Sequence, residues 1–181
     1  MKAIGVIEIT SVAKGIEICD RMIKASNVKV LEALPLCPGK YVIIIGGKVA
    51  DVKNSVDVAV EEAGAFLVDR LLIPNIDDQV FKALNNTNSI DNVEALGIIE
   101  TFSVSSGIMA ADTAVKAANV HLIEVRLSRG LGGKAFVTMT GTVGDVKAAV
   151  SAGSEQAKSD GLLVGFAVIP SPHEDLKKFI V

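Results

Sequence analysis

The sequence predicts an α+β protein in which two tandem copies of one domain each have the element order β-α-β-β-α-β. Two observations lead to this prediction: the second half of the chain repeats the first, and each half alternates short apolar strands with helices that carry an apolar face. This order defines the split βαβ, or ferredoxin-like, arrangement. Many unrelated functions occur on it, so the fold class alone does not indicate an activity.

The repeat extends over nearly the whole chain. Segments of the first copy return in the same order in the second: 3–8 as 95–100, 24–28 as 116–120, 39–40 as 133–134, 51–53 as 145–147, and 73–74 as 169–170. The polar stretch 85–89 is typical of a linker. We therefore predict a first domain over residues 1–88 and a second over residues 93–181.

The elements of the first copy follow from their apolar spacing and their ends. We expect strands over 3–9, 28–34, 41–45 and 68–73, a helix from its cap Ser11 to about Ala25, a second helix capped by Asp51, and a short helix after Pro74. The segment 35–40 is predicted to be a loop, because its two prolines and its glycine restrict or bend the backbone.

Both helices of the first copy carry an apolar face. The first helix is expected to place these residues together: Val12, Ile16, Cys19 and Ile23. The second helix is expected to direct these residues inward: Val52, Val56, Ala59, Val60 and Ala63. Each helix therefore predicts one face packed on the sheet.

Composition and charge exclude several classes of function. The chain has 181 residues, of which 50% are hydrophobic, and a formal net charge of -3 with a pI near 5.4. With no basic field and only 4% aromatic residues, a nucleic-acid partner is not expected. No apolar run reaches the ~20 residues of a membrane-spanning helix, and the N-terminus lacks a secretory signal pattern. We expect a cytoplasmic protein with no membrane partner.

The sequence contains no catalytic constellation. His121 and His173 lie far apart, and neither has a paired carboxylate or nucleophile pattern near it. The glycine-rich run 129–134 fails the phosphate-binding P-loop pattern, because Ala135 stands where Ser or Thr should follow the lysine. We therefore do not expect an enzyme.

The two cysteines are too few for a disulfide framework. Cys19 lies in mid-helix at apolar spacing, and its counterpart in the second copy is Ala111, so we expect it in the core. Cys37 lies in the predicted loop 35–40. On the residues alone it is either a small packed hydrophobe or one ligand of a metal centre that takes its ligands from several chains.

The repeated motifs resemble bacterial microcompartment shell domains. The resemblance rests on the A-I-G-x-I-E strand, the K-A-x-N-V element, the Gly-Lys loop, the Gly-Gly turn after the next strand and the I-P ending, and it covers the chain twice. It implies an unpermuted tandem shell protein, located in the microcompartment shell beside other shell proteins. In that type three chains form a homotrimer, a pseudohexameric tile.

The loops of the two copies are similar to those of T-type propanediol-utilisation shell proteins. The resemblance places these residues in the loops around the central pore of the tile: Pro38, Gly39, Lys40, Gly132, Gly133 and Lys134. Members of that group hold an iron–sulfur cluster at the centre of the trimer. The resemblance therefore implies one [4Fe–4S] cluster per trimer, bound by Cys37 of three chains.

Two functions follow from this resemblance. The cluster would transfer electrons across the shell or sense redox state, with an encapsulated or cytosolic redox protein as its partner. The alternative is a cluster-free tile whose central pore conducts small metabolites.

The resemblance also implies contacts at the tile edge. Lys24 with Asn27, and Lys116 with Asn119, match the edge lysine and asparagine of shell domains. A lysine in the last helical turn also interacts favourably with the helix dipole, so a solvated helix end is the alternative. We favour the tile-edge role for both pairs. The family usually has arginine after the I-P pair, where this chain has Asn75 and Ser171. This departure puts one hydrogen-bonding contact between tiles in doubt.

Overall fold

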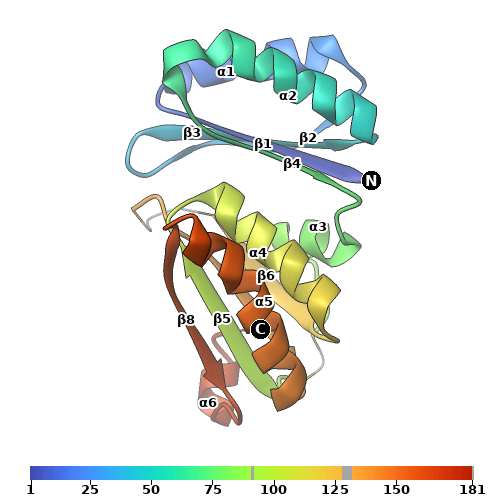
Figure 1. Ribbon diagram of the computed structural model, residues 1–181, viewed down its shortest axis with the longest axis vertical. Helices are drawn as coiled ribbons and strands as arrows, with labels where there is room; N and C mark the ends of the chain where they lie inside the picture. The colour runs from blue at the N-terminus through green and yellow to red at the C-terminus, as the bar shows by residue number, and fades with distance from the viewer. Residues whose placement is uncertain (91, 128–131, 181) are drawn as a thin grey trace. The chain divides into compact units, whose positions relative to one another are not determined.

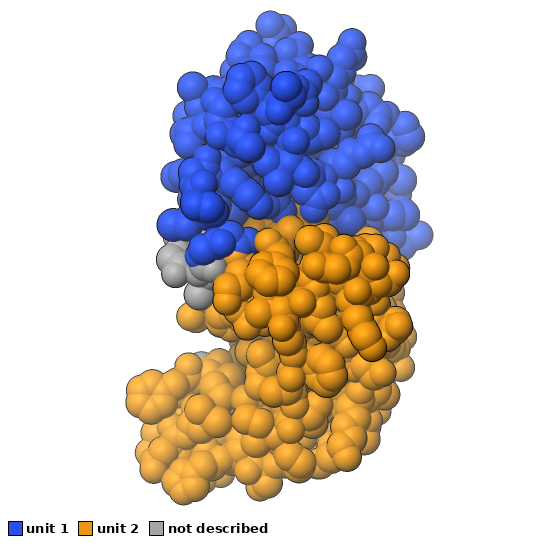
Figure 2. Space-filling model, turned by 60° about the vertical axis from the view of Figure 1, so that its left-hand side comes forward, with its two compact units in different colours: residues 1–76, 129–133 blue, residues 77–128, 134–181 orange. Residues whose placement is uncertain are grey.

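A computed structural model describes residues 1–90, 92–127 and 132–180 of the chain. Contacts divide it into two compact units, which Figure 2 shows in different colours: unit 1 comprises Met1–Ile76 with Arg129–Gly133, and unit 2 comprises Asp77–Ser128 with Lys134–Val181. The predicted domain boundaries at 88 and 93 concern the sequence repeat and stay a prediction. The described part of the chain contains no helix long and apolar enough to cross a lipid bilayer.

Unit 1 is a four-stranded antiparallel sheet with two helices on one face (Figure 1). Its elements are β1 (Ala3–Ile9), α1 (Val12–Ala25), β2 (Lys29–Leu36), β3 (Lys40–Gly47), α2 (Val49–Ala63), the 3-10 turn η1 (Gly64–Phe66) and β4 (Leu67–Pro74). The strand order β2-β3-β1-β4 is that of the ferredoxin-like arrangement, so the predicted fold class is confirmed.

Unit 2 repeats this plan. Its elements are α3 (Asp78–Leu84), β5 (Ala95–Thr101), α4 (Val104–Ala117), β6 (His121–Arg126), β7 (Ala135–Gly141), α5 (Val143–Ser159), β8 (Leu163–Ile169) and α6 (Glu174–Lys177). The strand order β6-β7-β5-β8 matches that of unit 1 element by element. Among the described residues, unit 2 also has two helices that unit 1 lacks, α3 and α6. Helix α3 packs against the edge strand β6.

The repeated glycine of the opening strand explains how helix and sheet fit together. A Cβ atom at Gly5 would lie 2.6 Å from a methyl carbon of Val56 on α2. At the equivalent Gly97, a Cβ atom would lie 2.8 Å from methyl carbons of Val146 and Val150 on α5. The helices therefore approach these strands more closely than any side chain at that position would allow.

The inward face of α1 differs from the predicted one. Cys19 is buried as expected, but Ile16 is 56% exposed and Ile23 is 47% exposed. The buried residues of this helix are Gly15, Ile18, Cys19 and Met22. The predicted apolar stripe is therefore rotated away from the sheet, and Cys19 lies where it meets the buried face.

Two boundaries also differ from prediction. The predicted loop 35–40 is a hairpin: β2 continues to Leu36, β3 begins at Lys40, and only residues 37–39 form the turn. Asp51 does not cap α2, because that helix already begins at Val49, after its N-cap Lys48. The Asp51 carboxylate lies in the first turn of the helix instead. An acidic side chain there still interacts favourably with the helix dipole.

Candidate functional site

The β2–β3 hairpin presents Cys37 at its tip. Cys37 is a free, exposed cysteine, and Pro38 and Gly39 complete the turn. Gly39 has a φ of 81°, in the left-handed region that glycine adopts readily, and a Cβ atom there would meet nothing within 4 Å. Backbone geometry, and not crowding, therefore calls for glycine beside the thiol.

A glycine from the second copy approaches this hairpin within unit 1. Gly133 has a φ of 88°, and a Cβ atom on it would lie 3.2 Å from the carbonyl oxygen of Cys37 and 3.4 Å from Cδ of Pro38. Gly132 also has a positive φ, 64°, with open space around it. The structure therefore brings the predicted loop residues Cys37, Pro38 and Gly133 together. Arg129, Gly130 and Leu131 of the same glycine-rich run lie outside the described residues.

The two predicted loop lysines are each paired with a glutamate on the opening strand of the same repeat. Lys40 Nζ lies 3.4 Å from Oε2 of Glu8, whose side chain is only 1% exposed. Lys134 Nζ lies 2.8 Å from Oε1 of Glu100, and both of these side chains are 38% exposed. The lysines therefore neutralise carboxylates beside the loop.

Glu8 and Glu100 were not among the site residues predicted from sequence. The signal was present, because the opening strand of each copy carries a glutamate one residue before its end, at a position where an apolar residue would fit the surrounding run. A buried carboxylate is costly without a partner. A repeated glutamate in an apolar strand thus predicts a nearby cation.

The predicted tile-edge residues lie at the ends of α1 and α4. Lys24 Nζ lies 2.6 Å from Oδ2 of Asp20, one turn earlier, and Lys116 Nζ lies 2.5 Å from Oδ2 of Asp112. Asn27 and Asn119 are exposed, each two residues beyond its helix. These pairs keep the lysines along the helix surface and do not test the predicted edge contacts.

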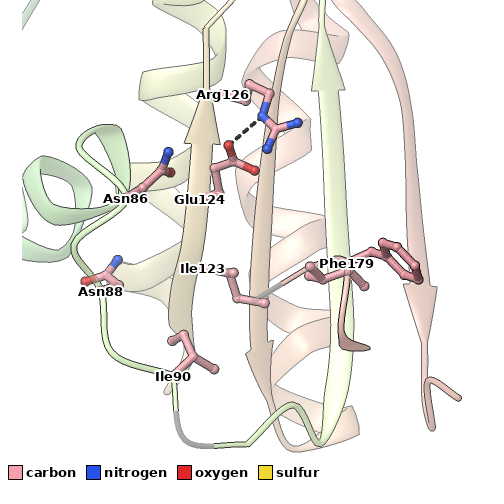
Figure 3. Close-up of a pocket in the computed structure, with 8 residues that line it drawn as sticks. Asn86, Asn88, Ile90, Ile123, Glu124, Arg126 and Phe179 are labelled. Atoms are coloured by element: carbon pink, nitrogen blue, oxygen red, sulfur yellow. Dashed lines mark hydrogen bonds and ion pairs between the residues drawn. The ribbon is translucent and has the colours of Figure 1, made fainter. Parts of the chain in front are cut away.

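Unit 2 also has a cavity of about 200 Å³, seen in Figure 3 on the face of its sheet away from the helices. Glu124 and Arg126 project into it from β6 and form an ion pair with each other. The Arg126 guanidinium also lies 5.2 Å from the centre of the Phe136 ring. The cavity is smaller than the usual few hundred Å³ of a ligand pocket, and its charges are already matched. It adds no catalytic group.

The described part of the chain contains no group of three or more His, Cys, Asp or Glu side chains able to hold a metal ion. Cys19 is unsuitable as a ligand, because burial raises the pKa of its thiol and the neighbouring Asp20 carboxylate raises it further. One described chain thus offers one exposed thiol, that of Cys37. A cluster with three cysteine ligands would need three chains.

Comparison with known proteins gives consistent results over the whole chain. The family model described as "BMC domain" matches residues 3–76 and again residues 95–172. The bacterial microcompartment shell protein PduT of Citrobacter freundii is 45% identical over 180 residues, which cover 99% of this chain and 98% of that protein. The shell protein PduA of the same organism is 42% identical over 88 residues, 48% of this chain and 91% of PduA.

A solved structure gives the same result. The crystal structure of a microcompartment protein from Desulfitobacterium hafniense has a TM-score of 0.94 and 47% sequence identity, covering 98% of this chain and 99% of that one. The agreement extends over both copies of the repeat.

Proposed function

We infer the function from one premise: this chain belongs to the BMC domain family. It is a structural shell protein of a bacterial microcompartment and is similar to PduT along its whole length. Its shell-protein relatives are structural, which fits the expectation that the chain is not an enzyme. The resemblance to a tandem microcompartment shell protein is thereby confirmed.

We propose that three copies of the chain form one tile of the shell. Each chain carries two BMC domains, whereas PduA matches about half of the chain with nearly all of its own length. One chain therefore takes the place of two single-domain proteins. Three chains supply six domains, enough for a pseudohexameric ring.

The tile is proposed to hold one [4Fe–4S] cluster, bound by Cys37 of three chains. The observation that carries this proposal is the exposed Cys37 thiol on a hairpin whose backbone contacts Gly133. A thiolate is the usual protein ligand of such a cluster. Three chains supply three thiolates, one for each of three iron atoms. The fourth iron would take a ligand from outside the trimer.

When bound, the cluster would supply one-electron transfer. Each chain would contribute one thiol, that of Cys37, and the charged residues near it. The lysines nearest the loops are already paired with Glu8 and Glu100. Electron transfer across the shell to a redox protein is the function proposed for this arrangement.

The test is an anaerobic preparation measured for iron, acid-labile sulfide, visible absorption and oligomer size. We expect about four iron atoms per three chains, as a [4Fe–4S] cluster requires. Cys37→Ser should lose iron and colour while the trimer stays intact. Cys19→Ala is the matched control, because alanine stands at the equivalent position 111, and it should keep both.

A colourless, iron-free wild-type trimer would refute the cluster and leave the metabolite pore. A monomer would refute the tile. Loss of iron in Cys19→Ala but not in Cys37→Ser would show that the ligand had been assigned to the wrong cysteine.

A further inference from the structure

The two sheets of the described chain have four edge strands, and three of them are protected against pairing with another chain. Proteins protect sheet edges with charged side chains, prolines, bulges or a covering helix. The edge strand β2 contains Pro35, and β4 contains Asp69 and Arg70. The edge strand β6 is covered by α3, where Gln79 Oε1 accepts a hydrogen bond from the main-chain N–H of Leu122 at 3.1 Å.

The fourth edge, β8, lacks this protection. Its sequence, LVGFAVI, contains no charged residue and no proline, and it pairs with β5. A register shift is confined to its start, and the pairing is regular from Gly165 to Ile169. Gly165 and Phe166 occupy the register positions that Asp69 and Arg70 occupy in unit 1. The second copy has therefore replaced two charges on this edge, and its Phe166 side chain is 61% exposed.

A groove of about 230 Å³ lies beside this edge, between β8 and α5. Helix α5 packs on both β5 and β8 (Figure 1). The groove is lined by polar side chains of the helix and apolar side chains of the strand, among them Lys147, Ser151, Glu155, Lys158, Phe166 and Val168. Because Phe166 and Val168 are two residues apart on one strand, their side chains lie on the same face of the sheet.

The helix side of the groove has lost an ion pair that unit 1 keeps. In unit 1, Lys53 Nζ lies 2.6 Å from Oδ2 of Asp57, one turn later on α2. The equivalent residues on α5 are Lys147 and Ser151, so the lysine remains and its acidic partner does not. The Lys147 ammonium group is therefore left to interact with something else.

The groove has gained a second lysine. Lys158 stands at the position of Gly64 in the first copy. Neither Lys147 nor Lys158 forms an ion pair within the described residues. Glu155 is the one acidic residue that lines the groove, so lysines outnumber carboxylates there. A negatively charged partner is therefore favoured.

We propose that the β8 edge and this groove bind an extended segment of a partner protein that carries acidic and apolar side chains. The segment would add a strand to the four-stranded sheet of unit 2. Main-chain hydrogen bonds to β8 would hold it, and every second side chain would enter the groove. The inference goes beyond the tile and its cluster, because it rests on unit 2 alone.

The spacing of the groove residues specifies the segment. Two apolar side chains with one residue between them would pack against Phe166 and Val168, which have the same spacing. Lys147 and Lys158 are separated along the axis of α5 by roughly 16 Å, at the helical rise per residue. An extended chain spans this distance in about five residues. Acidic residues on both sides of the apolar pair would therefore reach the two lysines.

The test is binding of a fluorescein-labelled peptide, E-T-V-T-V-T-E, to the wild-type protein. Its glutamates and valines lie on one face of an extended chain, and its threonines favour that conformation. Fluorescence anisotropy at low ionic strength should show saturable binding, and amide hydrogen exchange of residues 163–169 should slow in the complex. The control peptide K-T-V-T-V-T-K should bind at least about tenfold more weakly, because its charges oppose the lysines. No binding of the acidic peptide, or equal binding of both peptides, would refute the proposal.

Two variants test the strand and the helix separately. Gly165→Asp with Phe166→Arg gives β8 the residues that β4 carries in the same register, so the sheet should fold and peptide binding should be lost. Lys147→Glu with Lys158→Glu should weaken binding at least about tenfold. Lys53→Glu is the matched control on α2 and should bind the peptide as the wild type does. Unchanged binding in either double variant, with an unchanged circular dichroism spectrum, would refute the proposal.

Pairing between the β8 edges of two copies of the chain is the other outcome, and light scattering detects it. With a partner segment as the occupant, the wild type and the Gly165→Asp, Phe166→Arg variant should have the same mass. A wild-type mass twice that of the variant would overturn the partner segment and assign this edge to a second copy.

Discussion

Lys40 and Lys134 offer a direct comparison of a buried and an exposed ion pair at the same place in two copies of one domain. Judged by distance alone, the Lys134–Glu100 pair, at 2.8 Å, should contribute more to stability than the Lys40–Glu8 pair, at 3.4 Å. Judged by burial, the Lys40–Glu8 pair should contribute more. Glu8 is 1% exposed, so Lys40→Met would leave a carboxylate in the core without its lysine. We expect a loss of roughly 1–3 kcal/mol in the free energy of unfolding.

Lys134→Met should cost less than about 1 kcal/mol, because water solvates a Glu100 side chain that is 38% exposed. The assay is urea unfolding followed by circular dichroism at constant protein concentration. Glu8→Gln added to Lys40→Met removes the buried charge and should recover part of the loss. Equal losses in the two lysine variants, or no recovery in the double variant, would refute the argument that burial decides.

Two further predictions concern the loop and the core. Gly132→Ala and Gly133→Ala should each destabilise the chain by about 1–2 kcal/mol, because both positions have a positive φ. Only Gly133→Ala should also change the rate at which Cys37 reacts with iodoacetamide, since only that Cβ atom meets Cys37 and Pro38; equal rates in both variants would contradict the contact. Burial raises the pKa of Cys19 and of Tyr41, so the folded state keeps protons that the unfolded state loses. Stability should therefore fall as the pH rises past their ordinary values of about 9 and 10, and fall less in Cys19→Ala with Tyr41→Phe. Thermal unfolding across this pH range measures the difference, and parallel curves for the two proteins would contradict it.

Much of the fold could be predicted because it depends on local pattern and on repetition. The opening strand Ala3–Ile9 and the helix capped by Ser11 have the bounds that their residues indicate. The repeat then doubles the information, since each element is observed twice. The predicted Asp51 cap was wrong because α2 begins two residues earlier, at Val49, directly after Lys48, and no side-chain hydrogen bond marks that helix start.

The candidate site was predicted less completely. Cys37 was found because a prolyl-glycyl turn beside a thiol is visible in the sequence, but the role of Cys37 as a ligand stays a prediction. Glu8 was missed because its partner Lys40 is 32 residues away, and only the pairing of β1 with β3 brings them together.

Sequence alone determined the duplication, the order of strands and helices, the family resemblance and the positions of the two cysteines. Each of these is a pattern of residue types along one chain. Only the tertiary structure decided which apolar residues are covered. Ile16 and Ile23 have the same spacing as a core stripe and are exposed. Val80 and Leu176 each stand six residues after the proline of the repeated Ile-Pro pair, yet Val80 is buried and Leu176 is 39% exposed. Burial depends on what packs against a side chain from elsewhere in the fold, and hydrophobic spacing along a helix does not carry that information.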